Sequence, residues 1–452
     1  MTGVPVGRHL ATGATVCMDP ISWFMRANLI SNPSMFTLGL PGLGKSSLTR
    51  RICLGLAGYG VLPLILGDLR PDYVQLIRAI GGQVIAPGQG ARLNILDPGD
   101  ATDAARQLTG EARESVLADA HRRRVVMMTA LLTISRRSEP TDTETAVLDR
   151  ALRVLDERLA TSGRAPELKD VYQIIEDAPE TIREVVLDRG SIDRYQEATS
   201  GLQRSLQALL TGRLGEFFSG QTTTPMRLDR PVAFDVSAIG DNDHDLQAAA
   251  LMACWSTGFA SVHVSNVLAD AGLGPRRYYF VVLDELWRAL RAGAGMVDRV
   301  DQLTRLNRAV GVGMSMISHT FADLDSLPRA EDRAKAKGFI ERAGIVVTGG
   351  LPSKEIPDLG QIVRYSDAEA DMLASWSTPP GWSSTEGRES EPPGRGKFLI
   401  KVGERPGIPF RTQLTRCERE VNDTNRMWHR DPAAADRLED SLNVDPEEQE
   451  FS

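Results

Sequence analysis

Residues 39–46 read Gly-Leu-Pro-Gly-Leu-Gly-Lys-Ser, and this run decides which kind of fold the chain adopts. It fits the pattern G-x-x-x-x-G-K-[ST], in which backbone N–H groups surround phosphate groups at the start of a helix. An apolar stretch at 35–40 predicts a strand before it, and residues 47–58 predict a helix after it. Because strand, loop and helix follow in the order that the motif requires, we predict a phosphate-binding loop and not an accidental glycine-rich turn.

The residues of this loop have separate predicted tasks. Gly42 and Gly44 permit a close approach of the backbone to the phosphates, and Lys45 would meet the β- and γ-phosphates of a nucleoside triphosphate. The Ser46 hydroxyl would bind Mg²⁺. The predicted cofactors are therefore ATP and Mg²⁺. Further loop positions assigned to nucleotide binding are Gly39, Leu43 and Ser47.

Length and composition predict a globular protein of more than one domain. The chain has 452 residues, of which 42% are hydrophobic, and a net charge of −8. Residues 431–452 carry eight acidic side chains and one arginine, so this segment supplies nearly all of the net charge and is predicted to be a disordered tail. A body near neutrality argues against a broad DNA-binding surface, although it allows a local basic channel.

The cysteines and the one long uncharged stretch indicate where the protein resides. Cys17, Cys53, Cys254 and Cys417 are scattered and form no C-x-x-C pair, as expected of buried thiols in a reducing compartment. Residues 246–269 contain no charged side chain but seven polar ones, too many for a membrane span of ~20 apolar residues. We expect a buried core helix in a soluble, cytoplasmic protein.

Alternating strand and helix patterns predict an α/β fold with a mostly parallel central sheet. After the loop, residues 61–66 and 83–86 read as strands on either side of a helix at 71–80, which opens with a proline. Strand patterns resume after a long helical region. The later predicted strands are 231–236, 277–283, 312–318, 343–348, 397–402 and 407–412.

The helical region between these strands predicts an all-α insertion. We expect two parts of an ATPase core at 1–100 and 231–416, with the insertion at 101–230 and a C-terminal extension at 417–452.

A second set of candidate groups follows an apolar strand pattern in residues 279–287 (YFVVLDELW). A strand-end Asp284 can hold Mg²⁺, and the adjacent Glu285 can orient and deprotonate an attacking water. An alternative is that the two acids favour a helix N-terminus through its dipole. The phosphate loop upstream favours the catalytic interpretation. The Asp-Glu pair also indicates hydrolysis, because no acceptor site of a kinase can be identified.

Two further polar residues lie at the tips of predicted strands. His319 is a candidate for sensing the γ-phosphate or positioning water; a partly buried surface histidine is the alternative. Asp68 either lines the nucleotide site or caps the next helix.

Several arginines are candidates for the residue that a neighbouring subunit supplies to stabilise transition-state charge. They are Arg305, Arg308 and Arg395, each of which reads as an ordinary surface arginine when taken alone. Residues 121–124 (HRRR), inside the helical region, favour a solvated helix face, with a phosphate- or acidic-lipid-binding patch as the alternative.

In this order the segments resemble the HerA–FtsK superfamily of ring-forming ATPases. Within it they are most similar to the ATPase domain of the TraC-like, VirB-four-type proteins of type IV secretion and conjugation systems. The matching pieces extend over nearly the whole chain, and those at 4–20 (VPVGRHLATGATVCMDP) and 92–98 (RLNILDP) discriminate best. The others are 32–51, 64–85, 231–239, 279–290, 307–324 and 394–420.

The resemblance implies a RecA-like core, a homo-hexamer and ATP hydrolysis between subunits, with Arg308 and Arg395 as candidate trans-acting arginines. The hydrolysis would energise substrate transfer or pilus assembly in bacterial conjugation at the inner face of the cell membrane. The implied partners are membrane-associated components of the secretion channel, with DNA as a further candidate.

The resemblance also assigns the site residues. It gives Lys45 and Ser46 to phosphate and Mg²⁺, and it gives Asp284 and Glu285 to the metal and to water activation. The family usually has a Thr-Gln pair where this chain has Ser318-His319, so the sensor role departs from the family pattern. Family members often carry an N-terminal docking domain, which we expect here to be absent or a separate chain.

Two other functions remain as alternatives. One is a DNA-pumping or end-processing ATPase like HerA or FtsK, which DNA would stimulate. The other is a scaffold that binds ATP with little turnover.

Overall fold

The computed structural model describes residues 2–159, 162–292, 296–304, 311–327, 329–379, 382–383, 388–389 and 392–421. Residues 1–413 form one compact unit. Residues 414–452 form a second unit, whose described part carries helix α18 (Arg416–Val421). The predicted acidic tail at 431–452 lies outside the described residues.

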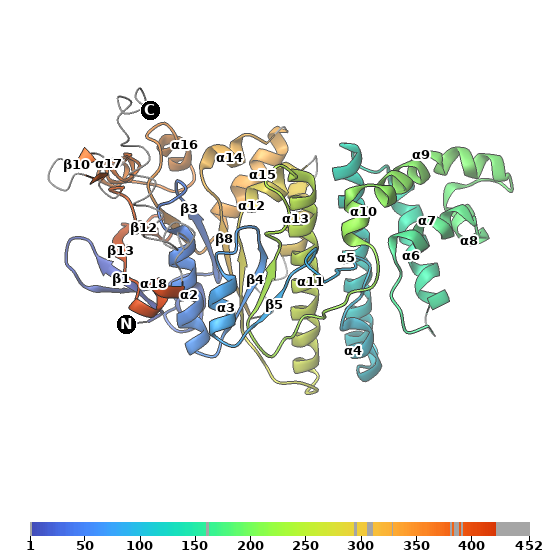
Figure 1. The fold of residues 1–452 in the computed structure, drawn as a ribbon, viewed down its shortest axis with the longest axis horizontal. Helices are drawn as coiled ribbons and strands as arrows, with labels where there is room; N and C mark the ends of the chain where they lie inside the picture. The colour runs from blue at the N-terminus through green and yellow to red at the C-terminus, as the bar shows by residue number, and fades with distance from the viewer. Residues whose placement is uncertain are drawn as a thin grey trace, which may run out of the picture. The chain divides into compact units, whose positions relative to one another are not determined.

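An eleven-stranded sheet is the centre of the first unit (Figure 1). The strands from β9 to β5 in the spatial order below are mutually parallel, and the four at the other end are antiparallel. The spatial order is β2 (Thr15–Cys17), β1 (Pro5–His9), β13 (Ile408–Thr412), β12 (Lys397–Lys401), β9 (Ile345–Thr348), β3 (Ser34–Leu38), β8 (Val312–Ile317), β7 (Tyr279–Leu283), β4 (Leu62–Asp68), β6 (Val232–Asp235) and β5 (Gln83–Ile85).

The parallel strands explain the continuous apolar runs in the sequence. Every residue of β3, β6, β7, β8 and β9 is buried, as expected for strands covered on both faces. All the strands that the sequence predicted, from 35–40 onward, are present. Their ends differ from the predicted ends by a few residues. The hairpin β1–β2 was not predicted; its strands are short and only partly buried.

The register of the central strands brings three chain segments to one edge. Thr37 pairs with Ile317 across β3 and β8, and Leu283 pairs with Met316 across β7 and β8. Because these strands are parallel, the loops that follow all three emerge side by side. This edge is where an α/β sheet places its ligands.

Helices cover the sheet, and the helices that directly follow β3, β7 and β8 begin where these loops end. Those of the core are α1 (Pro20–Met25), α2 (Lys45–Gly58), α3 (Val74–Ala79), α11 (His244–Asp270), α12 (Leu286–Arg291), α13 (Met296–Thr304), α14 (Phe321–Asp325), α15 (Ala330–Glu341), α16 (Ile356–Gly360) and α17 (Asp367–Trp376).

The described residues between β5 and β6 form helices and no strand, as predicted for the insertion. They are α4 (Ala101–Gln107), α5 (Gly110–Arg136), α6 (Asp142–Leu159), α7 (Leu168–Glu176), α8 (Glu180–Arg183), a 3-10 turn (Glu184–Val186), α9 (Ile192–Thr211) and α10 (Arg213–Phe218).

Helix α11 confirms the expected buried core helix. It contacts β4 on one side and α5 on the other, so it stands between the sheet and the insertion (Figure 1). One continuous hydrophobic core extends from the sheet into the insertion helices. The boundaries at residues 100 and 230 therefore remain predictions. In the part of the chain that the structure describes, no helix is both long and apolar enough to cross a membrane.

Two sequence expectations differ from the structure. The helix predicted from residue 71 begins at Val74, because the carboxylate of Asp68 accepts the backbone N–H groups of Asp72 and Tyr73 and closes a turn first. The segment 121–124 is no solvated face: all but Arg122 are buried. These side chains form ion pairs with aspartates of α5 and α6.

Candidate nucleotide site

The phosphate loop joins β3 to α2 at the shared edge of the sheet. Gly42 and Gly44 have φ values of 78° and 99°, a left-handed conformation that favours glycine. Gly44 is the N-cap residue of α2, so the first helical residues are Lys45 and Ser46. The loop thus has the backbone form of an anion cradle at a helix N-terminus.

Neighbouring segments hold the loop at both ends. The Gly39 N–H donates to the His319 carbonyl at 2.8 Å, which ties the loop to the residue that follows β8. At the other end, the Gly396 N–H donates to the Leu43 carbonyl at 2.9 Å. Backbone hydrogen bonds therefore tie the loop to the residue after β8 and to the residue before β12.

Lys45 folds back onto its own loop. Its Nζ lies 2.5 Å from the Gly39 carbonyl and 3.2 Å from the Leu40 carbonyl. Burial lowers the pKa of Lys45 to about 8, while the nearby carboxylates of Asp284 and Glu285 act in the opposite direction. The side chain is thus still an ammonium group at neutral pH.

Asp284 follows β7 and is held from two sides. Its Oδ1 accepts the Glu285 N–H at 2.9 Å, and its Oδ2 accepts the Tyr73 hydroxyl at 2.8 Å. Burial, together with the charge of Glu285, raises the pKa of Asp284 to about 6.

Glu285 has a φ of 54°, which is rare for a residue with a side chain and costs on the order of 1–3 kcal/mol. Its Oε2 accepts the Trp287 indole N–H at 2.7 Å and lies 3.4 Å from the Arg288 Nε. Its Oε1 lies 3.2 Å from His319 Nε2. Burial alone would raise the pKa of Glu285, but the hydrogen bond from His319 and the nearby Arg288 guanidinium lower it to about 2.

His319 connects the two halves of the site. Its Nδ1 lies 3.1 Å from Lys45 Nζ, and its Nε2 contacts Glu285. Because the Lys45 ammonium can only donate, these contacts fit the tautomer that carries its hydrogen on Nε2. The predicted strand-tip histidine therefore lies between the loop lysine and the strand-end acid.

The other candidates lie in different settings. The buried carboxylate of Asp68 accepts the N–H groups of Asp72 and Tyr73 in the turn before α3, whose N-cap residue is Tyr73, and a role of Asp68 in the nucleotide site stays a prediction. Arg395 is exposed, in the turn whose Gly396 bonds to the loop of the same chain. Arg305 and Arg308 lie outside the described residues.

Sequence reasoning missed the residues that hold the two acids. Tyr73 contacts Asp284 across 211 positions of the chain, and no local pattern signals such a contact. Trp287 is part of the quoted segment 279–287. Its indole contact with Glu285 could not be predicted, because it depends on the left-handed backbone conformation of Glu285. Arg288 and Arg291 both stack on the Trp287 ring, with guanidinium carbons 4.8 Å and 4.9 Å from its centroid.

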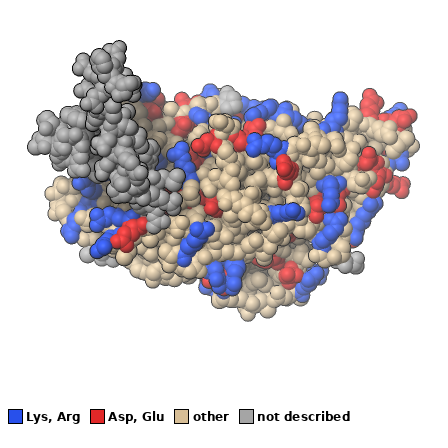
Figure 2. Space-filling view, in the orientation of Figure 1, with Lys and Arg blue, Asp and Glu red and all other residues tan. Residues whose placement is uncertain are grey.

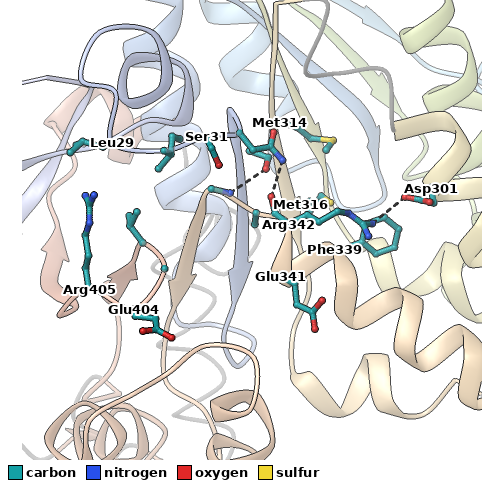
Figure 3. A pocket seen from close by; sticks show the side chains of 17 residues that line it. Leu29, Ser31, Asp301, Met314, Met316, Phe339, Glu341, Arg342, Glu404 and Arg405 are labelled. Carbon is teal, nitrogen blue, oxygen red and sulfur yellow. Dashed lines mark hydrogen bonds and ion pairs between the residues drawn. The ribbon is translucent and has the colours of Figure 1, made fainter.

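A large cavity lies elsewhere, at the opposite edge of the sheet (Figure 3). It has a volume of about 940 Å³, and its lining includes the segment before β3, side chains of β8, the segment from the end of α15 to the residue before β9, and the turn after β12. Two of its lining residues, Arg342 and Asp301, form an ion pair at 3.1 Å. Its position separates it from the phosphate loop, so it is no part of this site.

The residues at the loop fit a nucleoside triphosphate with Mg²⁺. The loop offers the backbone cradle and the buried ammonium, and the hydroxyl of Ser46 and the carboxylate of Asp284 are the hard oxygen ligands that Mg²⁺ prefers. Fold and site together define a RecA-like P-loop NTPase architecture.

Comparison with known proteins agrees with this class. The structure of VirB4 of Thermoanaerobacter pseudethanolicus is similar with a TM-score of 0.66 and 17% identity, over 92% of this chain and 98% of that chain. The plasmid coupling protein TrwB in complex with ADP and Mg²⁺ is similar with a TM-score of 0.51 and 14% identity, over 87% of both chains. At these identities the likeness shows the fold. No protein-family model matches the chain, and no curated protein matches its sequence.

Proposed function

We propose that this protein is an ATP-hydrolysing motor of a conjugative type IV secretion system that energises substrate transfer or channel assembly. The observation that carries the proposal is the line of contacts from Lys45 through His319 to Glu285, which joins the phosphate loop and the strand-end acids in one site. The fold supports it, because VirB4 and the coupling protein TrwB share that fold.

In the proposed reaction, the loop backbone and Lys45 bind the phosphates, and Glu285 orients the attacking water and accepts its proton. Ser46 and Asp284 would hold Mg²⁺, which supplies charge neutralisation at the phosphates when it is bound. In the structure, donors engage both oxygens of Glu285. When Lys45 turns from the loop carbonyls to a phosphate, it leaves His319 Nδ1, and His319 would keep Glu285 in position through Nε2.

We propose that the motor works as a homo-hexamer at the cytoplasmic face of the cell membrane, together with membrane-associated components of the secretion channel. Arg308 or Arg395 would act on the nucleotide of the neighbouring subunit. The contact of the Arg395 turn with the loop of its own chain supports a role within the same subunit as well.

ATP hydrolysis by the purified chain with Mg²⁺ tests the enzymatic part. We expect Lys45→Ala to abolish hydrolysis and to weaken ATP binding, because the buried ammonium is the only cation that contacts both the loop and His319 among the described residues. The matched control is Lys354→Ala, which removes an exposed lysine and should hydrolyse ATP like the wild type. Wild-type protein that binds ATP without hydrolysing it would leave a nucleotide-binding scaffold as the function.

A DNA translocase is the second candidate, because a plasmid coupling protein, TrwB, shares the fold. On the face seen in Figure 2, however, basic and acidic side chains are interspersed and do not gather into a basic surface. Because the body of the chain is also near neutrality, we expect hydrolysis to change little when DNA is added. Strong stimulation by DNA that falls steeply with salt would favour the translocase, whereas co-purification with membrane-bound channel components would favour the secretion motor.

A further inference from the structure

The turn after β4 carries a fully buried tyrosine toward the strand-end acids. The Asp68 carboxylate accepts the Asp72 N–H at 3.2 Å and the Tyr73 N–H at 2.8 Å, so it fixes the backbone from which the Tyr73 ring extends. Asp68 is 2% exposed and Tyr73 is 0% exposed. Tyr73 therefore enters the site from a rigid turn, although it belongs to neither sequence motif.

The Tyr73 hydroxyl completes the hold on Asp284. It donates to Oδ2 at 2.8 Å, while the Glu285 N–H donates to Oδ1 at 2.9 Å. Each carboxylate oxygen has two lone pairs, so each keeps one for another partner. The plane of the carboxylate is thus fixed from both sides while both oxygens stay available as ligands.

The same turn is also tied to the phosphate loop. The buried Arg50 of α2 donates from Nη1 to the Asp72 carbonyl at 2.6 Å and from Nη2 to the Ser47 hydroxyl at 3.2 Å. Ser47 directly follows Ser46, the loop hydroxyl assigned to Mg²⁺. One short turn therefore contacts both the helix that carries Ser46 and the carboxylate of Asp284.

From these contacts we infer that Tyr73 is a positioning residue for Mg²⁺ binding. Its hydroxyl orients the Asp284 carboxylate, and Arg50 keeps the turn in register with the phosphate loop, so that Ser46 and Asp284 stay at a fixed separation although they lie in different elements. The inference rests on the proposed function, since it concerns the metal that accompanies the nucleotide. Groups that orient a metal ligand in this way typically contribute about 10–100-fold to metal affinity or activity.

The test measures the affinity of the full chain for ADP in Mg²⁺ and in a chelator. The ratio of these two affinities is the gain due to Mg²⁺, and it is obtained without turnover. In Tyr73→Phe the ring stays and only the hydroxyl is lost. We expect ADP affinity in chelator to be unchanged and the gain due to Mg²⁺ to fall about tenfold. Tyr195→Phe is the matched control: Tyr195 is 1% exposed, and its hydroxyl donates to the Ile175 carbonyl inside the insertion. Its gain due to Mg²⁺ should equal that of the wild type.

The outcomes separate the inference from the function on which it rests. An unchanged gain in Tyr73→Phe, with a normal wild type, would overturn the inference and leave the proposed function intact. A wild type that binds ADP equally with and without Mg²⁺ would overturn both. If Tyr73→Phe does not fold, Arg50→Gln serves instead, because it removes the Arg50 guanidinium that bonds to Asp72 and Ser47 while the chain keeps the Tyr73 hydroxyl and the Asp284 carboxylate. Its gain due to Mg²⁺ should fall as well, and an unchanged gain would overturn the inference.

Discussion

His319 is the residue at which the two halves of the candidate site meet. It contacts Lys45 with one ring nitrogen and Glu285 with the other, and its ring lies 6.2 Å from that of Trp287. Without the imidazole, the side-chain donors that remain on the Glu285 carboxylate among the described residues are those of Trp287 and Arg288, both on Oε2, so Oε1 would lose its partner. Misplacement of a reacting group by about 1 Å can cost about 100-fold in rate.

Replacing His319 should therefore affect turnover more than binding. We expect His319→Ala to lower kcat about 10–100-fold while the affinity for ADP changes far less, since the loop cradle is intact. His244→Gln, a change at an exposed histidine, is the control and should behave like the wild type. Intrinsic fluorescence adds a second measurement. ATP should change the fluorescence of the wild type through Trp287, and this change should be lost in Trp287→Phe. A kcat of His319→Ala equal to that of the wild type would contradict the proposal that His319 connects Lys45 to Glu285.

The raised pKa of Asp284 predicts how Mg²⁺ binding depends on pH. Burial and the charge of Glu285 raise that pKa to about 6, so the carboxyl group is protonated below this pH and ionised above it. Because Mg²⁺ needs the ionised form, the Mg²⁺ concentration at half-maximal ADP binding should rise by up to about tenfold per unit as the pH falls below about 6. Titrations of Asp284→Asn should show only the weaker dependence that comes from protonation of the ADP phosphate, whose second pKa is also about 6. Equally steep profiles in the wild type and in Asp284→Asn would argue against Asp284 as the metal ligand.

At the scale of elements, ion pairs whose α5 partner is buried and whose α6 partner is partly exposed join α5 to α6 in the insertion. Arg124 donates both Nη groups to the Asp156 carboxylate at 2.7 Å, and its side chain is 6% exposed, whereas the side chain of Arg122 is 61% exposed. We expect Arg124→Ala to lower the free energy of unfolding by about 2 kcal/mol and Arg122→Ala by less than about 1 kcal/mol, because exposed pairs contribute little. Chemical denaturation measures both. Equal losses would mean that burial does not set the strength of these pairs.

The helices and strands differ in how far the sequence alone could predict them. The phosphate loop and the apolar strand before Asp284 are local patterns, so their order predicted the core sheet and most of the site. The hairpin β1–β2 is stabilised by pairing with β13, about 400 residues away, and its own strands are too short to carry a signal. The contacts of Tyr73 and His319 likewise depend on how distant strands meet.

At the scale of the whole molecule, the proposed ring makes a prediction about mass. With ATP and Mg²⁺, light scattering on a sizing column should give six times the mass of one chain, because trans-acting arginines require neighbouring subunits around each nucleotide. The Glu285→Gln variant should keep the ring for longer, since it retains unhydrolysed ATP. A single-chain mass at high protein concentration under these conditions would contradict the assembly.

The most direct test of the central claim is to analyse the nucleotide that the protein holds after incubation with ATP and Mg²⁺, in the wild type and in Glu285→Gln. If the phosphate loop and the strand-end acids form one hydrolytic site, the wild type releases phosphate and holds ADP, whereas Glu285→Gln binds ATP and keeps it intact. Equal phosphate release by the two proteins, or failure of both to bind ATP, would contradict the account.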